Sequence, residues 1–177
     1  MSPPRGSAAV AGFSVVSDRA ETSRAAAARL NDHGPILLAV ARTMTVDEAD
    51  AQDLVQSTFE IALRRLPALR DQAAMRSWLL RIETREAMRV TRRMRRFVRL
   101  DDHVREISPG TLGMTDRLAL RHALATLPLR IRAAVALHHL AGMSVRETAE
   151  ALGVSENTIK SELKAGLVRL RRELFDG

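Results

Sequence analysis

A stripe of arginines recurs at helical spacing in the middle of the chain. Its members are Arg81, Arg85, Arg89, Arg92, Arg93 and Arg96. Steps of three and four residues place most of them on one helical face, where like charges repel each other. Glu83 and Glu86 offset only the first part of the stripe, so the rest favours an external anion. A solvated face and a membrane-surface helix are the alternatives, but phosphate binding explains the uncompensated charge best.

A second candidate binding surface follows Gly153, near the C-terminus. Ala149 and Gly153 have the spacing of two helices that cross at a tight turn, and glycine suits the left-handed turn position. Ser155 would cap the second helix, whose apolar stripe comprises Ile159, Leu163, Leu167 and Leu170. Its other face carries Asn157, Lys160, Ser161, Lys164 and Arg171. This pattern predicts a helix-turn-helix that enters a DNA major groove; an ordinary helical hairpin is the alternative.

An acidic cluster has the opposite character. Asp47, Glu48, Asp50 and Asp53 crowd the start of a predicted helix. Negative charge is favourable at the positive end of a helix, and from the residues alone we prefer this interpretation. The alternative is a protein-docking surface, since these carboxylates would repel nucleic acid.

Composition narrows the function further. The chain has 177 residues, a net charge of +7 and a pI of about 11.3, which favours polyanionic partners. Cysteine is absent, the histidines lack metal-ligand spacing, and no nucleophile–base set is recognisable, so we expect no enzyme, metal or cofactor. We found no membrane-spanning run and no secretory signal, and therefore expect a cytoplasmic protein without membrane insertion.

Periodicity predicts an all-α protein. After a disordered tail over residues 1–20, helices are expected over 21–31, from Pro35, from Thr45 to Pro67, and from Ser77 to Leu100. We expect Thr45 and Glu48 to form a capping box and Ser77 to be a cap. A second capping box is expected at Ser144 and Glu147, after helices interrupted at Leu127–Pro128 and at Gly142.

The composition changes after Leu100. Residues 100–114 contain acidic residues, a proline and two glycines, which predicts a flexible linker. The chain is therefore expected to form two small helical domains, over 21–99 and 115–177.

The order of these segments resembles a family. The stretches "DEADAQDLVQSTFEIAL", "SWLLRIETREAMRVTRRMRR" and "LPLRIRAAVALHHLAGMSVRETAEALGVSENTIKSELKAGLVRLRREL" resemble bacterial RNA polymerase sigma factors of the extracytoplasmic-function (ECF) type, within the sigma-70 family. The resemblance covers roughly residues 25 to 174. It implies a region 2-type helical bundle and a region 4-type helix-turn-helix.

The resemblance also implies roles for residues. In the family, the acidic helix docks on the clamp helices of the polymerase β′ subunit, and the matching positions here are Asp50, Asp53, Leu54, Gln56 and Phe59. This favours the docking interpretation of the acidic cluster. The arginine helix and the preceding loop, about Pro67 to Arg76, would bind and open the promoter −10 element. The −35 element would be read by Ser155, Asn157, Thr158, Lys160, Ser161 and Lys164.

Further partners implied by the family are the polymerase β subunit and an anti-sigma factor. The linker would thread toward the polymerase active-site channel. Some positions depart from the family pattern: Thr84, Arg85 and Arg89 replace the usual residues of the −10 helix, and Glu162 replaces an arginine common in the recognition helix. Glu162 is expected to accept a hydrogen bond from cytosine or to pair with Arg146 or Lys164.

Two alternative functions stay open at this point. One is a stand-alone helix-turn-helix transcriptional regulator that binds its operator without polymerase. The other is a basic adaptor protein of polymerase, for which removal of the arginines would leave promoter opening unchanged. For Trp78, core packing is preferred over a contact with opened DNA.

Overall fold

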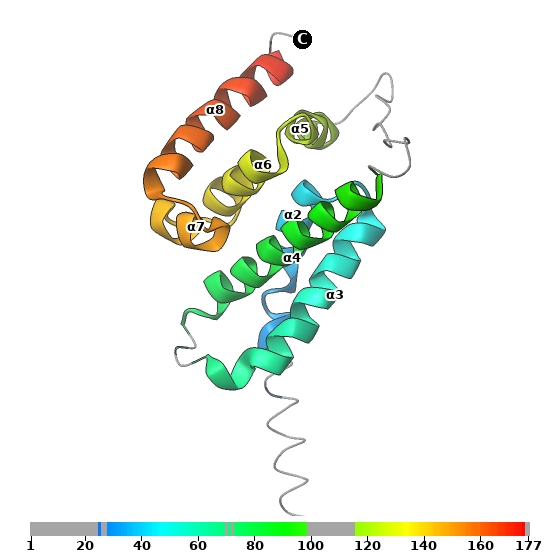
Figure 1. Cartoon of the computed structure of the whole chain (residues 1–177), viewed down its shortest axis with the longest axis vertical. Coiled ribbons are helices and arrows are strands. Elements are labelled where there is room, and N and C mark those ends of the chain that lie inside the picture. Colours follow the sequence, from blue (N-terminus) through cyan, green and yellow to red (C-terminus); the bar gives the residue numbers. More distant parts are fainter. Residues whose placement is uncertain (1–24, 26–27, 70, 72, 99–115, 176–177) are drawn as a thin grey trace, which may run out of the picture. The chain divides into compact units, whose positions relative to one another are not determined.

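The structure is a computed structural model that describes residues 25, 28–69, 71, 73–98 and 116–175. Every regular element within these ranges is a helix, which confirms the predicted all-α class (Figure 1). Contacts divide the chain into two units, Met1–Gly34 and Pro35–Gly177. In the first unit, residues 28–31 are helical and Leu30 is buried. The predicted tail over 1–20 and linker over 100–114 lie outside the described residues.

Within the second unit, the first helices are α2 (Gly34–Met44), α3 (Glu48–Arg65), the short 3₁₀ helix η1 (Leu66–Ala68) and α4 (Met75–Val98). Helices α3 and α4 pack side by side (Figure 1). Each helix buries an apolar stripe at helical spacing, which is what holds an amphipathic helix in a bundle. The buried side chains include Leu37, Val40, Leu54, Ala62, Leu79 and Leu80.

The start of α3 differs from the prediction. The Thr45 hydroxyl donates to the Ala41 carbonyl oxygen at 3.0 Å instead of capping α3. The Glu48 carboxylate accepts from Arg42 Nε at 2.8 Å, so it is not available to complete a capping box. Asp47 is the cap, with Oδ1 accepting from the Asp50 backbone N–H at 2.8 Å. The predicted Thr45–Glu48 box is therefore wrong because both side chains have other partners.

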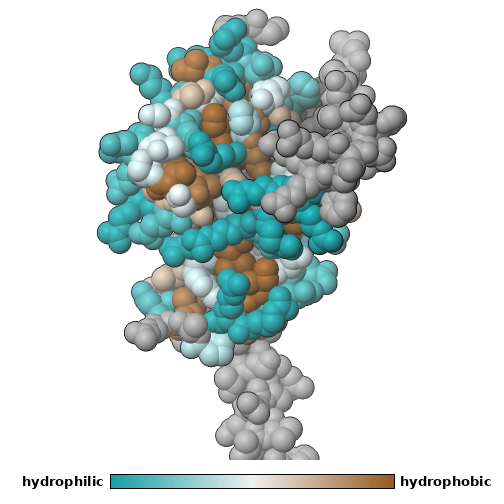
Figure 2. All heavy atoms as spheres, viewed as in Figure 1, coloured by the Kyte–Doolittle hydropathy of each residue, from teal (hydrophilic) through white to brown (hydrophobic). Residues whose placement is uncertain are grey.

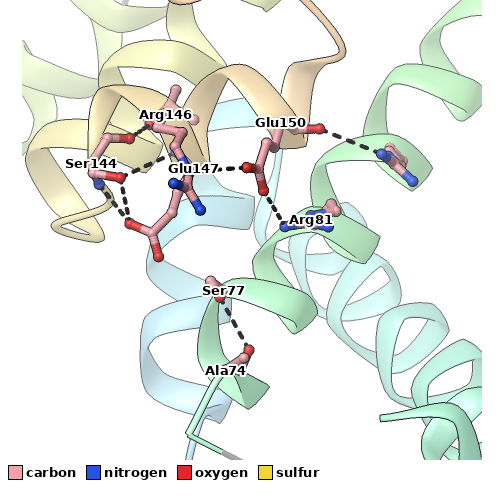
Figure 3. A network of polar contacts seen from close by, with 9 residues as sticks. Ala74, Ser77, Arg81, Ser144, Arg146, Glu147 and Glu150 are labelled. Carbon is pink, nitrogen blue, oxygen red and sulfur yellow. Dashed lines mark hydrogen bonds and ion pairs between the residues drawn. The ribbon is translucent and has the colours of Figure 1, made fainter. Parts of the chain in front are cut away.

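The predicted cap of α4 is also wrong. The helix begins at Met75, and the Ser77 hydroxyl lies inside the first turn, donating to the Ala74 carbonyl oxygen at 3.1 Å (Figure 3). The Met75 side chain is only 5% exposed. Burial of the Met75 side chain favours a helix that already includes Met75, whereas a cap at Ser77 would start the helix after Ser77.

The remaining helices are α5 (Asp116–Ala125), α6 (Leu129–Val135), the π-helical turn η2 (Ala136–Leu140), α7 (Val145–Leu152) and α8 (Glu156–Phe175). Helix α8 packs on α5, α6 and α7. The core between these helices contains Leu127, Ala134, Ala149, Ile159, Leu163 and Leu170.

One member of the predicted apolar stripe of α8 is not part of this core. Leu167 is 47% exposed. Gly166 lies against α6 instead, where a Cβ atom would be 2.8 Å from Val135 Cγ2 and 3.0 Å from Ile131 Cγ2. The absence of a side chain at Gly166 lets the two helices approach closely, and this turns Leu167 outward.

The break between α5 and α6 occurs at Leu127–Pro128, as predicted. Pro128 is the N-cap of α6. Arg132, which no sequence pattern singled out, satisfies the end of α5: Nη2 donates to the carbonyl oxygens of Ala125 at 3.0 Å and Leu127 at 2.9 Å. Burial lowers the pKa of the Arg132 guanidinium. A buried cation is tolerable there because carbonyl oxygens at a helix C-terminus carry partial negative charge.

After α6, the chain widens into η2 before it turns. The Ala141 N–H donates to the Ala136 carbonyl oxygen at 2.9 Å, a bond across five residues instead of four. His138 Nδ1 lies 2.7 Å from the Met143 carbonyl oxygen. Gly142 has φ of 67°, so the predicted glycine stop is confirmed in the left-handed conformation.

The exposed surface combines polar residues with scattered apolar ones. In the face drawn in Figure 2, hydrophilic residues cover most of the surface, with smaller apolar patches between them. Exposed apolar side chains include Val46, Leu63, Val90, Met94, Leu140 and Phe175. Among the described residues, no helix is both long and apolar enough to cross a bilayer.

Candidate nucleic-acid interface

Helices α7 and α8 form the predicted helix-turn-helix. Gly153 has φ of 68°, in the left-handed region, and the Val154 N–H donates to the Ala149 carbonyl oxygen at 3.1 Å. Ala149 is 4% exposed, and Ile159 is fully buried in the core beneath the turn. The small side chain at Ala149 and the positive φ at Gly153 therefore serve the roles that their spacing predicted.

Side-chain caps fix the starts of both helices. At α7, Ser144 and Glu147 form the predicted capping box: Ser144 Oγ accepts from the Glu147 N–H at 3.1 Å, and Glu147 Oε2 accepts from the Ser144 N–H at 2.8 Å (Figure 3). The hydrogen bond from the Ser144 backbone is the main reason that the pKa of Glu147 is lowered. At α8, Ser155 Oγ accepts from the Thr158 N–H at 3.1 Å. The orientation of α8 is thus set by bonds at its start as well as by its core.

The side chains predicted to read the −35 element divide into two groups. Asn157, Lys160, Ser161 and Lys164 are exposed on α8. Ser155 and Thr158 bond to each other, with Oγ and Oγ1 2.8 Å apart. The first group presents amide, hydroxyl and ammonium groups to solvent, which suits contacts with base edges and phosphates. The second group has a local structural role at the helix start.

Glu162 differs from the prediction. It is 8% exposed, so it does not share the solvent-exposed face of α8. Its Oε1 accepts from Arg130 Nε at 2.7 Å, whereas Arg146 pairs with Glu150. The predicted pairing with Arg146 or Lys164 is wrong because Glu162 faces α6, which supplies its partner.

The arginine stripe lies along α4, and its first members have protein partners. Arg81 Nη2 is 3.0 Å from Glu150 Oε2 of α7 (Figure 3). Arg85 Nη2 donates to the Glu150 carbonyl oxygen at 3.4 Å. The first two arginines of the stripe therefore have partners in α7 of the same chain: Arg81 pairs with the Glu150 carboxylate, and Arg85 bonds to the Glu150 backbone carbonyl.

Farther along α4, Arg89 pairs with a carboxylate of its own helix. Its Nε donates to Glu86 Oε2 at 2.8 Å, and this hydrogen bond is the main reason that the pKa of Glu86 is lowered. Arg92 and Arg93 are exposed, and the side chain of Arg96 lies outside what the structure describes. Arg85, Arg89, Arg92 and Arg93 line a hollow of about 650 Å³ that also borders Gly153. Four guanidinium groups around one hollow form a strongly anion-attracting surface.

Glu83 does not balance the arginines, contrary to expectation. Its side chain is fully buried in α4, and neither carboxylate oxygen has a hydrogen-bond partner among the described residues. Burial raises the pKa of Glu83 well above its ordinary value of 4.5. The carboxyl is therefore neutral over a wider pH range than an exposed glutamate, and its negative charge is not available to the stripe.

The acidic face of α3 includes only some of the predicted docking residues. Asp50, Asp53 and Gln56 are exposed. Leu54 is 6% exposed and belongs to the core, and Phe59 is half-buried. The structure therefore brings two carboxylates and an amide together on the surface. Trp78 is also half-buried, so its ring is partly within the packing of α4 and partly accessible.

The helices up to α4 and the helices from α5 onward each match a known protein family. Residues 30–97 match "Sigma-70 region 2", and residues 117–170 match "Sigma-70, region 4". The RNA polymerase sigma-E factor of Streptomyces coelicolor is 34% identical over 140 residues, covering 78% of this chain and 79% of that protein. The ECF RNA polymerase sigma factor SigM of Mycobacterium tuberculosis is 31% identical, covering 98% of this chain and 94% of that protein.

Solved structures agree with these matches. The sigma factor RpoE in complex with the anti-sigma factor NepR, from Bartonella quintana, has a TM-score of 0.72 at 26% identity. It covers 87% of this chain and 96% of that chain. CnrH in complex with the cytosolic domain of CnrY has a TM-score of 0.63 at 29% identity, covering 85% and 88% of the two chains.

The helix-turn-helix, the arginine-lined surface and these matches define a DNA-binding protein of transcription initiation. The chain belongs to the sigma-70 family of RNA polymerase sigma factors and to its ECF type. Its function is accordingly that of a promoter-specific sigma factor. The alternatives of a stand-alone regulator and an adaptor are not favoured.

Proposed function

We propose a division of labour between the helices of this sigma factor. Helix α8 reads the −35 element through Asn157, Lys160, Ser161 and Lys164, which are exposed beside a capped helix start. Helix α4 holds phosphates beside the −10 element through Arg89, Arg92 and Arg93. The loop between η1 and α4 receives an unpaired base of the opened strand. Unstacking that base costs a few kcal/mol, which binding to polymerase and promoter must supply.

We propose the same domain boundaries as the sequence predicts. A region 2-like domain spans residues 21–99, a linker spans 100–114, and a region 4-like domain spans 115–177. The acidic face of α3 holds the β′ clamp helices of polymerase, with Asp50 and Asp53 as its charged residues. Leu54 supports this face from the core because it is buried there. We expect the β subunit to be a further contact.

The protein acts by binding and not by catalysis. It works in the cytoplasm, where polymerase and promoters are found. We infer an anti-sigma factor as its regulator, because the similar sigma factor RpoE has been solved in complex with the anti-sigma factor NepR. The observation that carries the proposal is the pairing of an arginine-rich helix with a helix-turn-helix in one chain.

Transcription from a promoter library tests the proposal. The purified chain is added to core polymerase with templates randomised at the −35 and −10 positions, and the RNA products are sequenced. We expect initiation from a restricted set of sequences, and only weak promoter binding by the chain alone. Absence of initiation from every template, together with tight operator binding by the isolated chain, would favour the stand-alone regulator.

Variants locate the residues that bind DNA. Replacing Arg89, Arg92 and Arg93 with alanine should reduce open-complex formation and make its salt dependence shallower, by up to about one log–log unit for each phosphate that is no longer bound. The matched control removes the same charge from Arg29, Arg64 and Arg65, which are exposed outside α4. If both triple variants reduce open-complex formation equally, the effect is one of net charge and the proposed role of α4 fails.

The acidic face has its own test. Replacing Asp50 and Asp53 with alanine should weaken binding to core polymerase, measured by titration with a fluorescently labelled chain. The control is Asp32→Ala, because Asp32 is exposed and outside α3. Unchanged affinity in the Asp50/Asp53 variant would contradict docking through this face.

A further inference from the structure

The recognition helix is held on α6 at two neighbouring points. At the first, Gly166 lets α8 approach Val135 and Ile131 so closely that a Cβ atom would clash. At the second, one helical turn earlier, Glu162 of α8 is bonded to Arg130 of α6. The close approach limits the distance between the helices. The ion pair restricts the rotation of α8 relative to α6, because a guanidinium and a carboxylate bond best in a shared plane.

Glu162 lies among the residues that present polar groups to DNA, but its own carboxylate faces inward. Lys160, Ser161 and Lys164 are exposed, whereas the Glu162 side chain is 10% exposed. Its Oε1 accepts from two nitrogens of Arg130, with the Nε contact at 2.7 Å and the Nη2 contact at 2.5 Å. Its Oε2 is buried without a hydrogen-bond partner in the described residues. The carboxylate is therefore committed to α6 and has no exposed acceptor for a base.

We propose that Glu162 and Arg130 form a positioning pair that sets the orientation of the recognition helix and thereby its −35 sequence preference. Rotation of α8 about its axis moves Lys160, Ser161 and Lys164 together relative to the groove. A hydrogen bond to a base edge depends on distance and angle, so a small rotation weakens base discrimination before it weakens phosphate attraction. Arg130 thus influences specificity from a helix outside the helix-turn-helix. This inference rests on the proposed reading of the −35 element by α8.

A competing interpretation is that Glu162 contacts a base directly. The two interpretations differ in what Arg130 does. If Glu162 reads a base, removing Arg130 frees the carboxylate and should preserve or strengthen its contribution. If the pair positions α8, removing either partner should have the same effect on the −35 profile.

The test uses the full chain in holoenzyme with the promoter library described above, at a temperature well below the unfolding transition of each variant. Four chains are compared with the unchanged protein: Arg130→Ala, Glu162→Ala, the swap Arg130→Glu/Glu162→Arg, and the control Glu173→Ala. Glu173 is an exposed carboxylate on the same helix. The −35 and −10 preferences are read separately from the same sequencing data.

We expect Arg130→Ala and Glu162→Ala each to reduce discrimination at one or more −35 base pairs by about fivefold or more, since a single base pair contributes about 1–3 kcal/mol of specificity. The −10 preference should be unchanged. The swap should restore the −35 profile because the opposite charges can pair again at the same two positions. Glu173→Ala should resemble the unchanged protein.

Three results would overturn the inference. The first is an unchanged −35 profile in Arg130→Ala. The second is a swap variant that regains stability but not the −35 profile, which would assign base contact to Glu162 itself. Should Arg130→Ala fail to fold, Arg130→Gln removes the charge but keeps much of the side chain, and an unchanged profile in that variant is the third. If the unchanged protein itself shows no −35 preference, the proposed function fails before this inference is reached.

Discussion

Glu83 gives the sharpest stability prediction. Replacing Glu83 with methionine should raise the free energy of unfolding at pH 7. The Glu83 side chain is fully buried, and both of its carboxylate oxygens are without hydrogen-bond partners in the part of the chain that the structure describes. Methionine has a similar length and a good helix propensity, so it fills the same space without a polar group.

The magnitude follows from the missing partners. A buried polar group that gives up its water without gaining a hydrogen bond costs about 1–3 kcal/mol, and an ionised group costs more. The variant should therefore be more stable than the unchanged protein by about 1–3 kcal/mol where the carboxyl is protonated, near pH 4, and by more at pH 7.

The gain should depend on pH with a definite sign. Burial raises the pKa of Glu83 in the folded state above its ordinary value of 4.5. As the pH rises above that ordinary value, the unfolded chain loses the Glu83 proton while the folded chain keeps it. Stability of the unchanged protein then falls with pH, by up to about 1.4 kcal/mol per unit, until the folded carboxyl also ionises. The Glu83→Met variant lacks this contribution, so its advantage should grow from its value near pH 4, where only the missing hydrogen bonds count, toward pH 7.

Urea unfolding followed by circular dichroism, at several pH values, measures this difference. The control is Glu60→Met, because Glu60 is an exposed glutamate on α3 and its replacement should change stability by no more than about 0.5 kcal/mol. Our account of Glu83 is refuted if Glu83→Met is no more stable than the unchanged protein at pH 7. It is refuted equally if the advantage is the same at pH 4 and pH 7.

Other predictions concern the region 4 helices, and thermal or urea unfolding measures each of them. Gly166→Ala should lower the free energy of unfolding by about 1–3 kcal/mol because the added Cβ meets Val135 at 2.8 Å; a neutral effect would mean that α6 and α8 are not so close. Ser144→Ala should cost about 1 kcal/mol through removal of the α7 cap, whereas Ser161→Ala, on an exposed part of α8, should cost less. Gly153→Ala should destabilise by about 1–2 kcal/mol because φ is 68°, and a smaller effect would contradict the left-handed turn.

Much of the C-terminal fold could be predicted from sequence because its signals are local. Ser144 and Glu147 are three residues apart, and their bonds depend only on the first turn of α7. Gly153 marks a turn whose conformation few other residues adopt. The prediction for the cap of α3 was wrong because Arg42, six residues from Glu48, competes for the same carboxylate.

Burial of acidic residues was harder to predict because it depends on packing between helices. Glu83 lies four residues after Leu79 and four before Ala87, so its position matches the buried face of α4. Its charge obscured that signal. Glu162 similarly follows Ile159 by three residues and precedes Gly166 by four. The choice of Arg130 as its partner depends on how α6 crosses α8, which no local pattern specifies.

The widened turn η2 makes chain length itself important in this part of the molecule. Because the Ala141 N–H reaches back five residues, the turn holds one residue more than a regular helical turn. Deleting a single residue there would let the helix close as a regular turn with the following residues in place, whereas a deletion in the regular helix α6 would rotate every residue that follows by about 100° around the helix axis. A one-residue deletion should therefore be tolerated within η2 and damaging in α6, a difference that substitutions alone would not reveal.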